Sequence, residues 1–291
     1  MKPIAGQREG WLYLAPALLF VVVFVVWPLG QLVAMSFTDL SLLGGGKNVG
    51  LGNYIKIWGD SGFWRALTFT SEYTLIITPI LMGLGFLLAL LTAPNTALKK
   101  FTRTLVFLPV VIGLGSSSLL WYWLFDEQVG LVNKFLVDVG LLHEPLIWFT
   151  KASVSMWAVI ISITWKVVGF GAVLFVAGIQ SINKEIVEAA VVDGAGYWSR
   201  ILHIVLPLSL RIILLTTLIS AIGSMLAFDQ WYIMTSGAPR GQTFTAVYWV
   251  YQSSFVSFKL GYGAALSLIL MAIIFVLSAA QIVLSARTQR P

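Results

Sequence analysis

The sequence predicts an all-α protein that crosses a membrane six times. Of its 291 residues, 58% are hydrophobic and only 10% are charged, whereas soluble domains average about 25% charged residues. The apolar residues form long continuous runs, while the strands of a membrane barrel would alternate over about ten residues. A helix needs roughly 17 to 25 apolar residues to cross a bilayer. Six charge-poor windows are long enough, namely residues 11–35, 73–93, 104–125, 152–179, 212–228 and 260–284.

The first window, residues 11–35, is expected to be a retained helix and not a signal peptide. The apolar core of a signal peptide spans about 7 to 15 residues and ends at a small-residue cleavage site. Here 25 uncharged residues run as far as Met35, and Ser36 and Phe37 follow. The chain contains no cysteine, so disulfides and thiolate metal sites are excluded.

The short segment between the second and third windows sets the predicted orientation. It carries Lys99, Lys100 and Arg103 and no acid, and cytoplasmic loops of membrane proteins are enriched in Lys and Arg. Ten basic residues and four acids fall on this side, against seven basic residues and eight acids on the other. The ten are Lys2, Arg8, Lys99, Lys100, Arg103, Lys184, Arg200, Arg211, Arg287 and Arg290. We therefore expect both termini in the cytoplasm.

The overall charge of +6 is explained by this topology and by anionic lipid headgroups. No basic surface interleaved with aromatic residues is evident, so nucleic acid is not an expected partner. His143 and His203 have no cysteine or acid pair near them at ligand spacing, and no metal site is predicted.

Lys166 is the one charged residue inside the six windows and lies near the middle of the fourth. A charge at the bilayer centre costs about 2.5–3.5 kcal/mol, so such a residue normally faces a cavity. A spacing of four places Ser162, Lys166 and Phe170 on one helical face, and their hydroxyl, ammonium and aromatic groups suit a sugar. The alternative is structural, with Lys166 paired to Asp229 or to a backbone carbonyl at a helix break near residues 169–171.

The segment between the fourth and fifth windows, about residues 181–208, contains a spaced motif. Its members are Glu188, Ala189, Ala190, Asp193, Gly194, Ile204, Leu206 and Pro207. The alanines favour a helix over 184–192, and Gly194 can take the left-handed conformation that ends one. A second helix over about 197–204 is expected to return to the bilayer. Pro207 would then start the fifth span, where its missing N–H does no harm.

This motif resembles the cytoplasmic coupling loop of ABC importer permeases. The resemblance to maltose-type sugar permeases covers nearly the whole chain. It includes Pro28, Ser36-Phe37, Gly50-Leu51, Asn53-Tyr54, Arg103-Thr104, Leu108-Pro109, Trp121, Gly130 to Asn133, Phe228-Asp229, Thr235, Gly237, Pro239, Tyr251 and Phe255. Two positions depart from the pattern, because Asn183 stands where proline is usual and Arg211-Ile212 follows Leu208 where a second proline is common.

The resemblance implies that the motif residues transmit force from a separate ATPase. The acids Glu188 and Asp193 would pair with basic residues on that ATPase, and the small alanines would let the helix sit in a groove on it. The simpler alternative is an ordinary cytoplasmic helical hairpin whose Gly194 and Pro207 are caps. That alternative leaves the fixed distance from Glu-Ala-Ala to both residues unexplained.

Ser224 and Phe228 at the end of the fifth window, with Asp229 directly after it, form a segment analogous to the polar face of the fourth. In the related sugar permeases the substrate lodges at mid-membrane against the corresponding parts of these two helices. Short polar side chains and aromatic rings would bind a sugar weakly, as release requires. The predicted substrate-pathway residues are Ser162, Lys166, Phe170, Ser224, Phe228 and Asp229.

We therefore predict a single transmembrane domain over residues 1–291 that acts as a permease subunit and not as an enzyme. It would import a sugar or sugar derivative by alternating access across a bacterial or archaeal cytoplasmic membrane. The implied partners are a second homologous permease, two ATP-binding subunits, an extracytoplasmic solute-binding protein and membrane lipid. ATP and Mg would be bound by the ATPase, and no cofactor is expected in this chain.

Two other functions compete with this assignment. Lys166 leaves open an anionic cargo such as glycerol phosphate. An ion-coupled secondary carrier is the other class, and it is disfavoured because such carriers use midplane acids or broken helices. The first, second, third, fourth and sixth windows contain no Asp or Glu, and Asp229 comes directly after the fifth.

Overall fold

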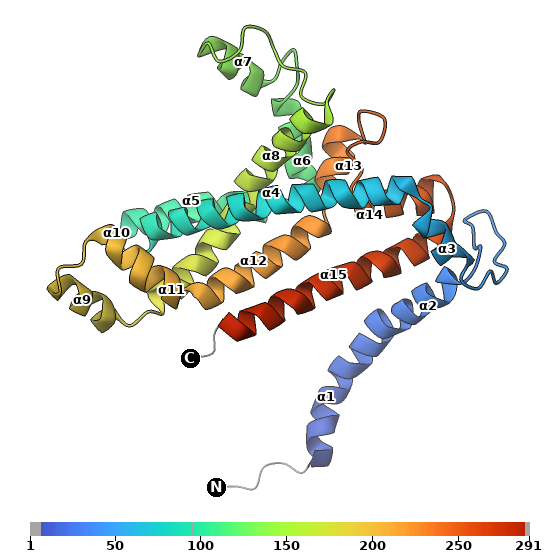
Figure 1. The fold of residues 1–291 in the computed structure, drawn as a ribbon, viewed down its shortest axis with the longest axis horizontal. Helices are drawn as coiled ribbons and strands as arrows, with labels where there is room; N and C mark the ends of the chain where they lie inside the picture. Colours follow the sequence, from blue (N-terminus) through green and yellow to red (C-terminus); the bar gives the residue numbers. More distant parts are fainter. Residues whose placement is uncertain (1–6, 95, 289–291) are drawn as a thin grey trace. The chain divides into compact units, whose positions relative to one another are not determined.

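The computed structural model describes residues 7–94 and 96–288, and the regular elements in these ranges are helices (Figure 1). Lys2 and Arg290, two of the basic residues used for the orientation, lie outside the described residues. The chain divides into two compact units, Met1–Ser61 with Trp249–Ile273 and Gly62–Tyr248 with Ile274–Pro291. The expectation of a single domain over 1–291 stays a prediction.

Four helices are long and apolar enough to cross a membrane. They are Tyr13–Ser36, Ser61–Thr92, Ala152–Gln180 and Leu260–Val283. Two bent pairs bring the number to six if each pair forms one span, Ala97–Val111 with Leu114–Leu124 and Tyr197–Leu208 with Leu210–Met225. The all-helical prediction is confirmed. The window 104–125 is not one continuous helix, because it is broken at Ile112 and Gly113. The window 212–228 coincides closely with one unbroken helix, Leu210–Met225, which follows a bent segment.

The first unit begins with α1 (Gln7–Val21), a π-helical turn (Val22–Val26) and α2 (Trp27–Ser36). The short helix α3 (Gly52–Trp58) follows. The buried Asn53 amide holds α3 to the end of α2, because its Nδ2 donates to the Ser36 and Thr38 carbonyls at 2.9 and 2.8 Å. The helix α3 ends at Trp58, and the next helix begins at Ser61.

The first half of α15 (Leu260–Thr288) completes the first unit. Asp60 connects the segments of this unit, since its Oδ2 accepts from Trp249 Nε1 at 3.0 Å and from the Tyr262 hydroxyl at 2.6 Å. Residues 252–256 form a second π-helical turn, Gln252–Val256, which follows the short helix α14 (Ala246–Tyr251).

The second unit is built on α4 (Ser61–Thr92), α5 (Ala97–Val111), α8 (Ala152–Gln180) and α12 (Leu210–Met225). One core cluster joins three of them: Ala89 of α4 and Phe175 of α8 are fully buried, and Ile212 of α12 packs against them. This burial of apolar side chains from three helices fixes α4, α8 and α12 side by side at one end of the unit.

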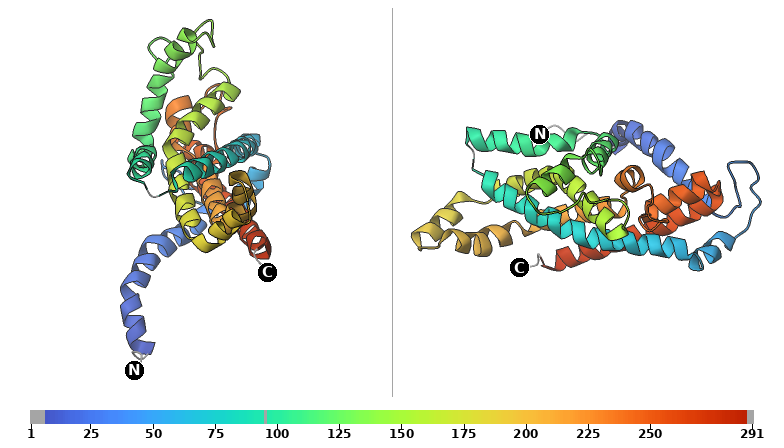
Figure 2. Two further views of the ribbon diagram at one scale, coloured as in Figure 1. Left: turned by 90° about the vertical axis from the view of Figure 1, so that its left-hand side faces the viewer. Right: turned by 90° about the horizontal axis from the view of Figure 1, so that it is seen from above.

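The chain turns sharply between α5 and α6 (Leu114–Leu124), where the two helix axes differ by 97°. Figure 2 shows α5 almost end-on while α6 rises away from it. Ile112 and Gly113 adopt extended conformations, with ψ of 136° and 145°. Two consecutive extended residues cannot continue a helix, so the last carbonyls of α5 lose their partners within the helix.

A buried asparagine organises the loop that follows α6. Asn133, in α7 (Leu131–Asp138), is 1% exposed. Its Oδ1 accepts from Leu146 N at 3.1 Å and Trp148 Nε1 at 3.0 Å, and its Nδ2 donates to the Asp126 and Leu146 carbonyls. The Asp126 carboxylate accepts from two backbone N–H groups, and these bonds lower the pKa of that carboxyl. The loop is therefore ordered by its own polar network.

We expect Gly169→Ala to destabilise the protein, because the backbones of α5 and α8 are in close contact there. A Cβ at Gly169 would overlap the carbonyl of Val106 on α5, which is backbone and cannot rotate away. Overpacking of this kind costs about 1–3 kcal/mol, so the thermal unfolding midpoint in detergent should fall. Gly83→Ala in α4 is the control, since nothing lies within 4 Å of its Cβ position. Equal midpoints for the two variants would contradict the close α5–α8 contact.

Candidate functional site

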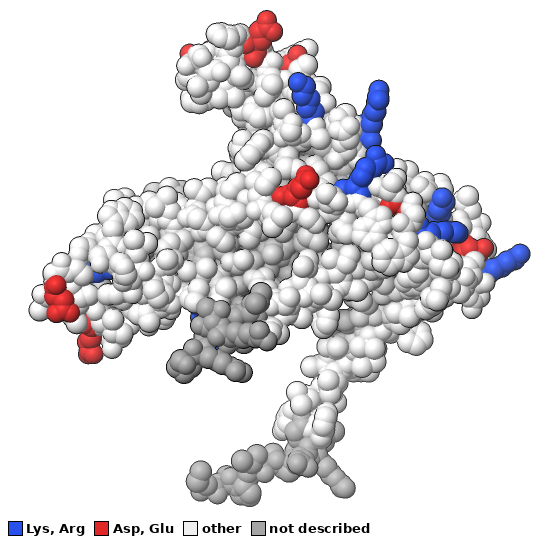
Figure 3. Space-filling model, in the orientation of Figure 1, with Lys and Arg blue, Asp and Glu red and all other residues white. Residues whose placement is uncertain are grey.

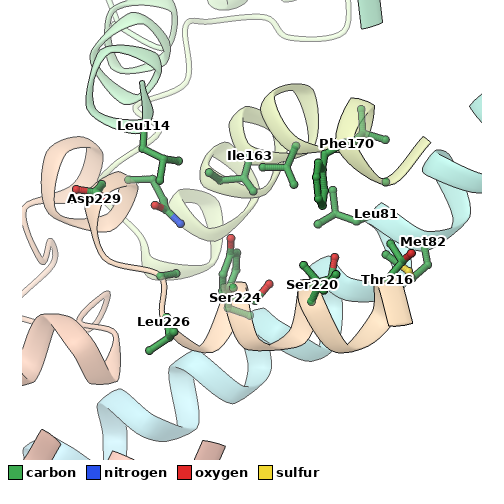
Figure 4. Close-up of a pocket in the computed structure, with 18 of the residues that line it drawn as sticks. Leu81, Met82, Leu114, Ile163, Phe170, Thr216, Ser220, Ser224, Leu226 and Asp229 are labelled. Carbon is green, nitrogen blue, oxygen red and sulfur yellow. The ribbon is translucent and has the colours of Figure 1, made fainter. Parts of the chain in front are cut away.

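A cavity of about 260 Å³ lies between α4, α8, α12 and the start of α13 (Asp229–Thr235). Figure 4 shows its lining, with Ile163 and Phe170 from α8 facing Ser220 and Ser224 from α12. The walls are largely apolar, with a few polar groups at defined places. This combination is typical of sites for small molecules.

The polar lining of α12 follows from helical spacing. Thr216, Ser220 and Ser224 are four residues apart, so their side chains share one face of the helix and all three line the cavity. Thr216 donates its hydroxyl to the Ile212 carbonyl of its own helix at 2.7 Å. Ser220 and Ser224 add two further hydroxyls to this face.

The start of α13 adds an amide and a carboxylate to the lining. Gln230 is 6% exposed, and it lines the cavity together with Tyr73 of α4. Asp229 lies in the first turn of α13, where a carboxylate complements the positive end of the helix dipole. Figure 4 shows Asp229 and Phe170 toward opposite ends of the cavity.

Four of the six predicted substrate-pathway residues line this cavity, namely Phe170, Ser224, Phe228 and Asp229. The Phe228 ring stacks on Tyr232 with 5.3 Å between ring centroids. Ser162 and Lys166 are not among the lining residues. Ser162 is 2% exposed and donates its hydroxyl to the Val159 carbonyl of its own helix at 2.8 Å.

Lys166 instead caps the broken end of α5. It is 5% exposed, and its Nζ donates to the carbonyls of Pro109 and Val110 at 3.3 Å each and to that of Ile112. An ammonium group has three N–H donors, so it can serve all three carbonyls. The Pro109 carbonyl also accepts from the Ile112 N–H at 3.2 Å, so Lys166 matters most for the carbonyls of Val110 and Ile112. The positive charge also lies at the negative end of the α5 dipole.

The helix break whose carbonyls bind Lys166 does not lie at the predicted position. The structural alternative put a break near residues 169–171, but α8 runs unbroken through this region from Ala152 to Gln180. The break lies on the neighbouring helix, at Ile112 and Gly113. Pro109 and Gly113 are signals that could have indicated it, since both residues often interrupt helices.

The predicted hairpin over residues 181–208 contains the helix α9 (Lys184–Val192), with the bounds expected from the sequence. Gly194 has φ of +79°, the left-handed conformation that glycine adopts without strain. The N–H of Gly194 bonds the Val191 carbonyl at 3.0 Å, and that of Ala195 bonds the Ala190 carbonyl at 2.8 Å. This pair of bonds is the Schellman motif that ends many helices.

Asn183, where related permeases usually have proline, begins α9 in another way. Its side-chain Oδ1 accepts a hydrogen bond from the Glu185 backbone N–H at 3.0 Å. Asparagine is among the best N-cap residues, so the departure from the family pattern preserves the start of the helix.

The return arm of the hairpin differs from the prediction. It comprises α10 (Tyr197–Arg200), a π-helical turn (Ile201–Val205) and α11 (Leu206–Leu208), followed by a 68° bend into α12. Pro207 therefore does not start α12, which begins at Leu210. Pro207 still occupies the first turn of a helix, α11, where a missing N–H is tolerated.

The motif residues of α9 lie on an open surface. No residue of α9 is buried, and Glu188, Ala189, Asp193 and Gly194 are exposed. Figure 3 shows acidic side chains at the end of the molecule formed by α9. Large apolar side chains are exposed beside them, with Val192 87% and Trp198 66% exposed. Apolar surface next to charge is typical of a surface that contacts another protein.

The hairpin is joined directly to two walls of the cavity. It leaves α8 after Gln180 and enters α12 at Leu210, and both helices line the cavity. Gln180 Nε2 also donates to the Ala93 carbonyl at the end of α4, at 2.9 Å. A displacement of the hairpin would therefore act on α8 and α12 together, because their ends share one packed cluster with α4.

The sequence reasoning missed several lining residues. Thr216 and Ser220 could have been found, since they continue the spacing of four that leads to Ser224. Tyr73 and Gln230 gave no such signal, because they lie far apart in the sequence and meet at the cavity only in the fold.

Comparison with known proteins agrees with this arrangement. The family described as "Binding-protein-dependent transport system inner membrane component" matches residues 81–290. The lactose transport system permease protein LacF of Rhizobium radiobacter is 33% identical over 275 residues, covering 93% of this chain and 91% of the relative. The sulfoquinovosyl glycerol permease SmoG of Agrobacterium fabrum is 34% identical over 266 residues, covering 90% and 85%.

The sn-glycerol-3-phosphate permease UgpA of Agrobacterium fabrum is 29% identical over 276 residues, covering 93% of this chain and 92% of the relative. Among solved structures, a chain of a bacterial ABC transporter that imports the acidic polysaccharide alginate superposes with a TM-score of 0.86. It is 22% identical, and the match covers 98% of both chains. The fold is therefore that of an ABC importer permease.

Proposed function

This chain belongs to the family of inner membrane components of binding-protein-dependent transport systems, and we propose that it is one of two permease subunits of an ATP-driven sugar importer. Relatives named for lactose, sulfoquinovosyl glycerol and glycerol 3-phosphate transport share sugar-like or polyol skeletons. The solute would be a sugar or a sugar derivative that passes through the cavity lined by Phe170, Ser224, Phe228 and Asp229.

One observation supports this proposal most directly. The exposed α9 hairpin stands between α8 and α12 in the chain, and these helices form two walls of a cavity with hydroxyl, amide and aromatic groups. An ATPase that moves α9 would change the distance between those walls. Alternating access needs this connection between a surface contact and a solute site.

The motif residues have separate roles in this mechanism. Ala189 and Ala190 let α9 approach a groove on the ATPase closely, and Gly194 sets the direction of the return arm. Glu188 and Asp193 pair with basic residues of the ATPase. Ile204, Leu206 and Pro207 form the rigid return arm that transmits the movement to α12.

The proposed assembly contains this chain, a second permease, two ATP-binding subunits and an extracytoplasmic solute-binding protein. The chain lies in a bacterial or archaeal cytoplasmic membrane with both termini in the cytoplasm. ATP and Mg are bound by the ATP-binding subunits, and this chain contributes no catalytic residue.

Co-purification tests the proposal. The tagged chain is extracted from its own membranes in mild detergent, and the proteins retained with it are identified by mass spectrometry. We expect an ATPase with a P-loop and a second permease of similar length. A chain that is recovered alone and that takes up solute in response to an ion gradient would refute the importer assignment.

A further inference from the structure

We propose that the cavity between α8, α12 and α13 selects uncharged carbohydrates and rejects anionic ones. This inference rests on the proposed function and adds the charge class of the solute. The relatives do not indicate whether the solute is charged, since lactose is uncharged whereas glycerol 3-phosphate and alginate are anionic.

The cavity offers no positive charge to an anion. Among the described residues that line it, Asp229 is the only charged one. A bound carboxylate, phosphate or sulfonate group would share this small and largely apolar space with a carboxylate. Like charges repel more strongly in such surroundings than in water, because the effective dielectric constant is lower.

Lys166, the one cation inside the predicted spans, is already engaged elsewhere. Its neighbours Ile163, Val167 and Phe170 line the cavity, but Lys166 does not. Its Nζ is directed to the carbonyls at the end of α5. To reach an anion, the ammonium group would have to leave the carbonyls of Val110 and Ile112 without their donor, which is costly.

The remaining polar groups match the hydroxyls of an uncharged sugar. Ser220, Ser224 and Gln230 can both donate and accept hydrogen bonds. The Asp229 carboxylate accepts from hydroxyl donors in charge-assisted bonds, which are stronger than neutral ones. Phe170 and Phe228 add apolar ring surface for the C–H faces of a sugar ring.

The test compares uptake of uncharged and anionic solutes by the complete importer. The importer, with its own binding protein, is reconstituted into proteoliposomes that contain ATP. Initial uptake is measured for radiolabelled lactose, maltose and galactose, and for lactobionate, galacturonate and glycerol 3-phosphate. We expect at least one uncharged sugar to enter at least about tenfold faster than every anionic solute, as a like charge near Asp229 would impose.

The variant Asp229→Asn assigns the selectivity to the cavity and not to the binding protein. The wild type and the variant are measured with the same binding protein, so a change in the ratio of anionic to uncharged uptake comes from the selectivity of the permease. We expect this ratio to rise several-fold in Asp229→Asn. Asp138→Asn, which removes an exposed acid of α7, should leave it unchanged.

Two results would overturn the inference. The first is that the wild type takes up an anionic solute as fast as the best uncharged sugar. The second is that the ratio of anionic to uncharged uptake in Asp229→Asn stays within twofold of the wild-type ratio. The sugar assignment fails separately if neither set of solutes enters while the binding protein still stimulates ATP hydrolysis.

Discussion

Lys166→Met is expected to reduce the amount of folded protein in the membrane several-fold and to lower its thermal stability. The substitution removes the three donors that satisfy the carbonyls of Pro109, Val110 and Ile112 and keeps an apolar side chain of similar length. The Pro109 carbonyl keeps its bond from the Ile112 N–H, whereas the Val110 and Ile112 carbonyls would each lose a partner, at a cost of about 1–3 kcal/mol for each unsatisfied group. The measurements are the yield of monodisperse protein in detergent and its unfolding midpoint.

Two control variants separate capping of α5 from contact with the solute. Lys166→Arg keeps a cation with several N–H donors and should recover part of the stability. Ser162→Ala, one turn earlier on α8, removes a hydroxyl bonded within its own helix and should have little effect. Normal stability of Lys166→Met combined with a tenfold higher KM for uptake would assign Lys166 to the substrate pathway instead.

Gly194→Val is expected to reduce ATP-driven uptake to less than a tenth of the wild type. Gly194 has φ of +79°, and an L residue pays about 1–2 kcal/mol in this conformation, with β-branched residues the least tolerant. The Schellman motif would open and the return arm would change direction. Nothing lies within 4 Å of the Cβ position, so the amount of chain in the membrane should be unchanged.

Gly196→Val is the matched control, since Gly196 lies two residues further on with φ of −66°, a value that valine adopts readily. Uptake and substrate-stimulated ATP hydrolysis are measured for both variants in proteoliposomes. Normal uptake by Gly194→Val would mean that the geometry of this turn is not needed for coupling.

Glu188→Lys is also expected to abolish uptake, through charge and not through backbone strain. Glu188 is exposed on α9, so the change should leave the fold intact while it repels basic residues on the ATPase. The ATPase should then be lost from the purified complex. Glu144→Lys, an exposed acid in the loop after α7, makes the same charge change elsewhere and should leave the complex intact.

Local sequence determined most of what concerns single helices. Four continuous apolar runs became helices long enough to cross a membrane, because chain length and hydrophobicity alone satisfy that requirement. The bounds of α9 and the left-handed Gly194 also followed from local rules. Alanine propensity and the freedom of a glycine backbone act within a few residues, so no distant contact was needed to predict them.

The tertiary structure decided the role of Lys166 and which residues line the cavity. The sequence could place Lys166 on a helical face with Ser162 and Phe170, but a face of a helix does not show which neighbour will cover it. The carbonyls that bind Lys166 lie more than fifty residues away, at a break whose position also escaped the sequence.

The same physical reason explains the lining of the cavity. Thr216, Ser220 and Ser224 share a face by helical spacing, whereas Tyr73 and Gln230 meet only because α4 and α13 come together in the fold. Hydrophobic patterning fixes which segments are helical, and packing between distant segments fixes which polar groups share a site. The sequence by itself therefore determined the family and the helix and turn at the start of the hairpin, and only the tertiary structure showed that Asp229 is the one charged group among the described residues that line the cavity.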